Sequence, residues 1–184
     1  IGTHQIVVTH NDMQTIAETS IEFAIGFGPI ILYRYQHNIT ETWTNGVLKK
    51  LICYTNRDGD ISRLSLERQE DQLFGVLNDT PIKRDVLLPT AYWNMALPGQ
   101  SKILETQDAK VFDVRWTNSP STFVYNNQQF PCMSWSARGD LNLNLLTNEK
   151  FGWCGMSFRF EGADFTYTPV MLGKYMSFDK DKMP

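Results

Sequence analysis

The segment from Tyr33 to Tyr54 is the part of the chain that most narrows the folds it can adopt. It reads Y-R-Y-Q-H-N-I-T-E-T-W up to Trp43 and continues through Asn45-Gly46 into a second alternating run. Asn-Gly supplies the two positive-φ residues of a type I′ turn, and both flanks alternate with period two. The segment therefore predicts a β-hairpin.

The same strand and turn patterns recur along the 184 residues. Roughly a dozen strand-like runs are separated by short turns, and no strand-helix-strand pattern interrupts them. We therefore expect an all-β fold, an antiparallel meander closed or half-closed into a barrel. It should form a single domain over residues 1–172, with a frayed C-terminal tail over residues 173–184.

One stretch, residues 89–99, differs from this pattern. Thr90 can cap a short helix, the Ala, Met and Leu residues that follow favour one, and Pro98-Gly99 would end it. We expect a helix of one to two turns over about residues 90–97. It carries Tyr92 and Trp93 and would act as a plug or lid on the sheet.

Charge and hydrophobicity exclude several classes of function. Lys plus Arg number 17 against 20 Asp plus Glu, a net charge of −3 without a basic block, so we expect no nucleic-acid partner. No window approaches the roughly 18 to 20 apolar residues of a transmembrane helix. The start at Ile1 suggests a removed leader or tag, and we expect a periplasmic or secreted protein with its signal peptide removed.

The cysteines and the short motifs do not indicate a cofactor. Cys53, Cys132 and Cys154 are too few and too widely spaced for a zinc site, and no dinucleotide, phosphate-loop or hydrolase motif is present. We expect neither metal nor cofactor. Cys132 and Cys154 would lie on neighbouring strands and could pair in an oxidising compartment; the alternative is that all three thiols are small buried hydrophobes.

One face of the predicted hairpin is the candidate site. A two-residue turn places Glu41 opposite Lys50 and His37 opposite Tyr54. The reverse face is mostly polar, so the face rich in Tyr and Trp should turn inward. His37 and Glu41 lie about 13 Å apart along one strand and cannot form a catalytic dyad with each other.

These residues predict a binding protein without catalytic activity. An aromatic face broken by one imidazole and one carboxylate suits a cavity for an apolar or lipid-like small molecule. The ligand-binding candidates are Tyr33, Tyr35, His37, Glu41, Trp43, Lys50, Tyr54, Tyr92 and Trp93. Two alternatives stay open: an isomerase, cyclase or hydrolase that uses His37 as acid or base with Glu41, and a structural or interaction protein of the cell envelope.

The chain also resembles a known but uncharacterised family. Tyr33-x-Tyr35-x-His37 leading to Glu41-x-Trp43-x-x-Gly46-x-Leu48, followed later by Tyr92-Trp93-Asn94, is similar to a bacterial domain-of-unknown-function family of mostly exported proteins. The resemblance implies an all-β barrel or half-barrel, similar in outline to periplasmic lipoprotein carriers. It implies no activity.

Overall fold

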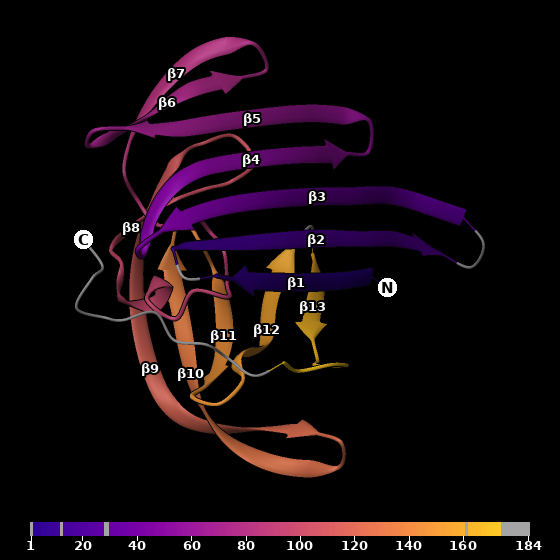
Figure 1. The fold of residues 1–184 in the computed structure, drawn as a ribbon. Helices are drawn as coiled ribbons and strands as arrows, with labels where there is room; N and C mark the ends of the chain where they lie inside the picture. The colour runs from indigo at the N-terminus through magenta and orange to yellow at the C-terminus, as the bar shows by residue number, and fades with distance from the viewer. Residues whose placement is uncertain (1, 12, 28–29, 161, 174–184) are drawn as a thin grey trace. The chain divides into compact units, whose positions relative to one another are not determined.

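The computed structural model describes residues 2–11, 13–27, 30–160 and 162–173, and nearly all regular structure in them is β-strand (Figure 1). The strands of this part of the chain form two sheets in which neighbouring strands run antiparallel. The prediction of an all-β antiparallel fold is confirmed.

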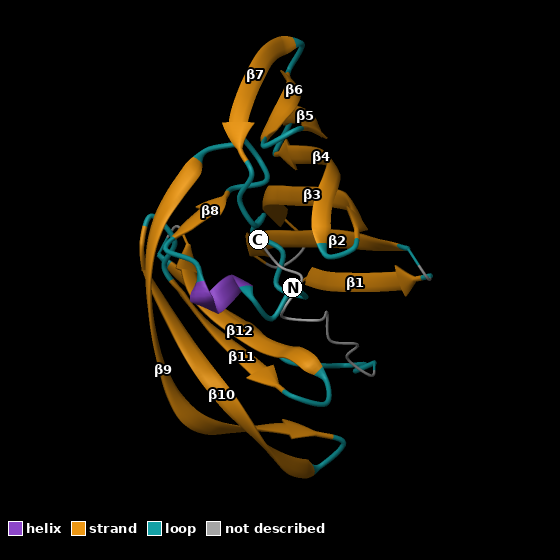
Figure 2. Cartoon of the chain, turned by 60° about the vertical axis from the view of Figure 1, so that its left-hand side comes forward, coloured by secondary structure: helices purple, strands orange, loops and turns teal. Residues whose placement is uncertain are grey.

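The first sheet is a meander in which each strand pairs with the next along the chain, from β1 to β7. Both figures of the fold show these strands side by side in sequence order (Figures 1 and 2). Its strands are β1 (Gly2–His10), β2 (Gln14–Phe27), β3 (Ile30–Thr44), β4 (Val47–Arg57), β5 (Asp60–Gln69), β6 (Gln72–Leu77) and β7 (Thr80–Asp85).

The second sheet is also a meander, with the strand order β13-β12-β11-β10-β9-β8. Long strands β9 and β10 pair along their length and form its largest ladder. Its strands are β8 (Lys102–Leu104), β9 (Val111–Tyr125), β10 (Gln128–Gly139), β11 (Leu143–Asn148), β12 (Gly152–Phe160) and β13 (Ala163–Tyr167).

Residues with positive φ at the turns explain why the strands reverse where they do. Asn45 and Gly46 have φ of 51° and 75°, as a type I′ turn requires, and they join β3 to β4. Asn126 and Asn127, with φ of 50° and 59°, join β9 to β10 in the same way. The hairpin predicted around Asn45-Gly46 is confirmed.

The chain divides into two compact units. Among the described residues, unit 1 contains those up to Leu87 together with Leu104–Lys110, and unit 2 contains Leu88–Ile103 and residues 111–173. A single domain over residues 1–172 stays a prediction.

Each unit has its own buried apolar residues. In unit 1 they lie on one face of the first sheet, called the inner face below, and include Ile39, Leu51, Cys53, Leu64, Leu66 and Leu73. In unit 2 the buried core consists of Leu97, Ile103, Val114, Ala137, Leu143, Leu145 and Met156.

Three expectations about the architecture need correction or fall outside the structure. Neither described sheet closes on itself, so the closed form of the barrel is wrong. Residues 90–96 form bends and turns, and the helix is a three-residue 3₁₀ segment, Leu97–Gly99. Asn94 Oδ1 accepts a hydrogen bond from the Ala96 N–H, a local bond that competes with helix formation. Of the tail predicted to fray, only residue 173 lies within the described residues.

The cysteines are free thiols, and their positions correct one expectation. Cys132 lies on β10 and Cys154 on β12, with β11 between them, so the two are not on neighbouring strands. Cys53 and Cys154 are buried and Cys132 is half-buried. Burial raises the pKa of Cys154 to about 12 and that of Cys53 well above its usual value.

Candidate functional site

The inner face of unit 1 carries the aromatic and polar residues that the hairpin pattern singled out. His37, Glu41 and Trp43 are buried on β3, while Tyr33 and Tyr35 are half-buried. Alternation along the strand places all five on one face. The expectation that this face turns inward is confirmed.

The pairing of β3 with β4 departs from the predicted register on the far side of Trp43 from the turn. Trp43 lies opposite Leu48 as expected, but a β-bulge between Thr42 and Trp43 shifts the register by one residue. Glu41 therefore lies opposite Leu51 and not opposite Lys50. A bulge inserts an extra residue into one strand, and the Asn-Gly turn gives no sign of it.

The register shift moves two candidate residues to the other face. Lys50 lies opposite Thr42 and is exposed, so the predicted ion pair between Glu41 and Lys50 is wrong. Tyr54 lies opposite Asn38, with the Arg63 guanidinium 5.6 Å from its ring centre. The predicted pairing of His37 with Tyr54 is also wrong.

Both ring nitrogens of His37 contact threonine hydroxyls. Nδ1 lies 2.8 Å from Oγ1 of Thr55, the residue opposite on β4, and Nε2 lies 3.0 Å from Oγ1 of Thr106. Burial, together with a smaller effect of the Arg57 charge, lowers the pKa of His37 to about 4. The imidazole is therefore neutral at pH 7, with one nitrogen donating and the other accepting.

Glu41 and Trp43 form a second buried polar pair. Trp43 Nε1 donates a hydrogen bond of 2.9 Å to Glu41 Oε2, and the two residues are 0% and 2% exposed. The two side chains lie on the same face of β3 because they are two residues apart. This contact gives the Glu41 carboxylate a buried partner other than Lys50.

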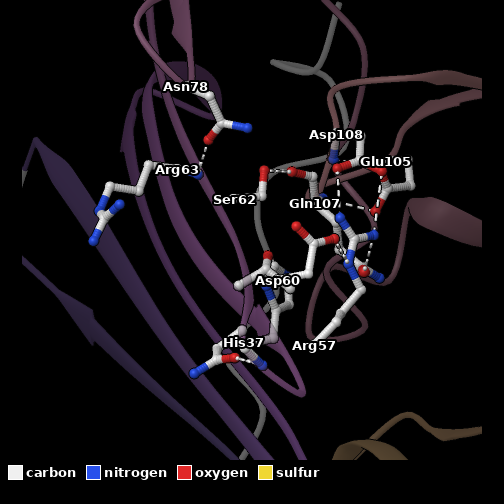
Figure 3. Close-up of polar contacts among 12 residues, drawn as sticks. His37, Arg57, Asp60, Ser62, Arg63, Asn78, Glu105, Gln107 and Asp108 are labelled. Atoms are coloured by element: carbon white, nitrogen blue, oxygen red, sulfur yellow. Dashed lines mark hydrogen bonds and ion pairs between the residues drawn. The ribbon is translucent and has the colours of Figure 1, made fainter.

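Arg57, at the end of β4, forms the charged part of the site. Its guanidinium donates to both carboxylate oxygens of Asp108 at 3.0 and 3.2 Å and to Gln107 Oε1 at 3.3 Å (Figure 3). Asp60 lies 3.7 Å from the same group. The hydrogen bond with Asp108 raises the pKa of Arg57, and the same hydrogen bond lowers the pKa of Asp108.

The segment Leu104–Lys110, called the return loop below, receives most of these bonds. Ser62 Oγ donates to the Gln107 carbonyl oxygen at 2.9 Å, and the Glu105 carboxylate accepts from the backbone N–H groups of Gln107 and Asp108 at 2.7 and 2.8 Å (Figure 3). Burial raises the pKa of Glu105. The polar residues of the inner face therefore hold the return loop against the first sheet.

Sequence reasoning missed this part of the site. It named His37 but not its partner Thr106, and it named neither the return loop nor the two other residues of the sheet that hold it, Arg57 and Ser62. These contacts join residues 45 to 69 positions apart in the chain. A run of polar residues, Glu105 to Asp108, between two strand-like segments is the only signal the sequence offers.

Beside His37 the inner face carries a row of aromatic rings. Phe23 stacks on Tyr35 with ring centres 4.8 Å apart and lies 6.2 Å from Tyr33. The rings of Tyr35 and His37 are also 6.2 Å apart. The three carbocyclic rings are half-buried, unlike the polar pair of Glu41 and Trp43 further along β3.

Tyr92 and Trp93, the remaining candidates, belong to unit 2. Trp93 is buried, and the half-buried Tyr92 packs against the core of unit 2 with its ring 6.2 Å from that of Trp153. Both follow Pro89 in a segment of turns. Their packing is that of core residues of unit 2.

In the part of the chain that the structure describes, no helix is long and apolar enough to cross a membrane.

Comparison with known proteins identifies the family. Neither the search of curated proteins nor the search of solved structures found a match. One family model, DUF6134, a domain of unknown function, matches residues 1–170. The suspected resemblance is confirmed, and the chain belongs to the DUF6134 family.

Proposed function

We propose that this chain is a non-catalytic binding protein that holds an apolar or lipid-like small molecule against the inner face of unit 1. The observation that carries the proposal is the row formed by Phe23, Tyr33 and Tyr35. Phe23 stacks on Tyr35 and lies tilted beside Tyr33, but all three rings are only half-buried, so they retain apolar surface for a ligand. Covering such surface contributes about 25 cal/mol per Å².

The charges beside the row favour a ligand without a strong net charge. Arg57 lies opposite Tyr35 on β4, but Asp108 neutralises its guanidinium at 3.0 Å. Lys110 lies 3.5 Å from the same carboxylate. A neutral polar end such as an alcohol or ester can accept or donate hydrogen bonds here without displacing an ion pair.

The geometry of His37 and Glu41 supports binding over the enzyme alternative. A general acid or base needs a nitrogen or oxygen within reach of the substrate and a pKa near the working pH. His37 contacts a hydroxyl with each nitrogen, and burial lowers its pKa to about 4. Glu41 is fully buried against Trp43.

The test begins with the purified full chain. Native mass spectrometry and lipid extraction should show a co-purifying apolar molecule, and delipidated protein should bind oleyl alcohol more tightly than oleate. Tyr35→Ala should weaken the binding of oleyl alcohol about tenfold, which corresponds to about 1.4 kcal/mol.

Tyr54→Ala is the matched control, because it removes the same ring from the opposite face of the sheet. Its affinity for oleyl alcohol should equal that of the unmodified chain. Absence of any bound molecule together with no binding of oleyl alcohol, or equal losses in the two variants, would contradict the proposal.

We also propose that the protein acts outside the cytoplasm. The support is the resemblance of its hairpin and Tyr92-Trp93-Asn94 motifs to those of mostly exported proteins. Fractionation of the native host followed by immunodetection should find the chain in the periplasm or the medium. Its recovery only with cytoplasmic markers would contradict this part.

A further inference from the structure

Strand β1 forms one end of the first sheet and differs from the other strands at sheet ends. In the strand order it has a single neighbour, β2, among the described residues (Figure 1). Its nine residues, Gly2–His10, contain no Asp, Glu, Lys, Arg or Pro. An edge of this length without charge or proline is a template for pairing with another strand.

The other end strands carry the features that block such pairing. β7 reads T-P-I-K-R-D, with a proline and three charged residues in six positions. β8 has only three residues, and β13 has five, with a charged Asp164. Short strands, charges and prolines are the usual protections of a sheet edge. β1 has none of them.

The side chains of β1 add exposed apolar surface on both faces of the sheet. Val7 is 44% exposed and Val8 is 41% exposed. They point to opposite faces because they are consecutive residues of one strand. A strand added at this edge would cover part of both side chains.

We propose that β1 is a self-association edge at which two copies of this chain pair antiparallel across a two-fold axis. Directly opposite residues must share a face of the sheet, so the paired numbers must have the same parity. The register centred on Ile6 pairs all nine residues. It places Gln5 of each copy opposite Val7 of the other, and no charge opposes a like charge.

This pairing continues the inner face from one copy to the next. His4, Ile6 and Val8 lie opposite Ile21, Thr19 and Ala17 of β2, and those residues lie on the inner face. In the proposed register Ile6 meets its own symmetry mate, and Val8 meets His4. Cross-strand apolar contact and up to nine residues of backbone pairing then stabilise the dimer.

The test introduces charges of either sign at Gln5 and Val7, which are both exposed and lie on the outer face. We expect the unmodified chain to form a dimer as its concentration rises from micromolar to millimolar in sedimentation equilibrium. Gln5→Lys/Val7→Lys should be monomeric, because the new ammonium groups face one another. Gln5→Glu/Val7→Glu should be monomeric for the same reason.

Mixing the two charged variants at low salt should restore a dimer that dissociates at high salt. Ile52→Lys/Val76→Lys is the control: both residues are exposed, and β4 and β6 each have neighbours on both sides, so it should dimerise like the unmodified chain. Circular dichroism checks that each variant is folded. A chain that stays monomeric throughout, a dimer that persists in the lysine variant, or a mixture that fails to dimerise overturns the proposal.

Discussion

Burial decides the charge of the His37 imidazole. A hydroxyl can donate or accept, so the contacts with Thr55 and Thr106 fit either tautomer of the neutral ring and do not by themselves exclude a protonated ring. Protonation would, however, place a charge in a buried site beside Arg57. Full stability of the folded chain therefore requires an uncharged His37, which links β3, β4 and the return loop.

This requirement predicts that the free energy of unfolding depends on pH. The pKa of His37 is lowered from 6.5 to about 4 in the folded chain, so the unfolded chain binds the proton more tightly. The contribution of His37 is complete above pH 6.5 and is lost as the pH falls toward 4. It amounts to something on the order of 3 kcal/mol.

Other groups must be separated from this effect. Burial lowers the pKa of His4 to about 3, which adds a loss in the same direction, whereas the raised pKa of Glu105 favours the folded chain as the pH falls. Urea unfolding of His37→Gln, whose amide does not titrate, should show a smaller loss between pH 6.5 and 4. An unchanged pH dependence would contradict this assignment.

At the scale of single elements, the bulge in the central hairpin decides which residues share a face. It leaves Glu41 buried against Trp43 and Lys50 exposed on the other side. If Glu41 and Lys50 formed an ion pair, removing either side chain would lower the free energy of unfolding by a similar amount. The observed register makes the two substitutions unequal.

We therefore expect Glu41→Ala to lower the free energy of unfolding by about 1–3 kcal/mol, because it leaves the Trp43 N–H without its acceptor in a buried site. Lys50→Ala should change it by less than about 0.5 kcal/mol, as an exposed substitution does. Urea unfolding of both variants at pH 7 measures the difference. Equal losses of unfolding free energy in the two variants would instead support the register without a bulge, in which Glu41 lies opposite Lys50.

The return loop is the element whose attachment the charged residues decide. Arg57 and Asp108 are 31% and 25% exposed, and their paired hydrogen bonds fix the orientation of the guanidinium. A double-mutant cycle of Arg57→Ala and Asp108→Ala should give a coupling energy of about 1 kcal/mol. Arg159 and Asp164 in unit 2 form the control pair.

That control pair is 71% and 80% exposed with its charged atoms 3.8 Å apart. Its coupling energy should be about 0.3 kcal/mol or less, because solvent and salt screen exposed charges. Urea unfolding of each set of four chains provides the measurement. A coupling at Arg57 and Asp108 no larger than in the control would mean that the return loop does not depend on this ion pair.

For the whole molecule, local patterns predicted the strands well and their long-range partners poorly. Asn45-Gly46 and Asn126-Asn127 encode their own turns through positive φ, so the hairpins follow from adjacent residues. The attachment of Thr106 and Asp108 to β3 and β4 depends on contacts across 50 or more residues. A single sequence contains no local pattern for such contacts. It contains no signal for the bulge near Trp43 either.

The thiols can show whether the two units unfold together. Burial raises the pKa of all three thiols, but Cys132 is only half-buried, whereas Cys53 in unit 1 and Cys154 in unit 2 are buried. With a thiol reagent at pH 8, one cysteine of the native chain should react quickly, and Cys132→Ser should abolish that phase. The other two should react only as their own unit opens.

Increasing urea then separates two outcomes. If the chain unfolds as one cooperative domain, as the single-domain prediction requires, Cys53 and Cys154 become reactive over the same range of urea concentration. Reaction of one buried thiol at clearly lower urea than the other would mean that the units unfold separately. Single-cysteine chains, with the remaining thiols changed to serine only where the native fold persists, assign each phase to its residue.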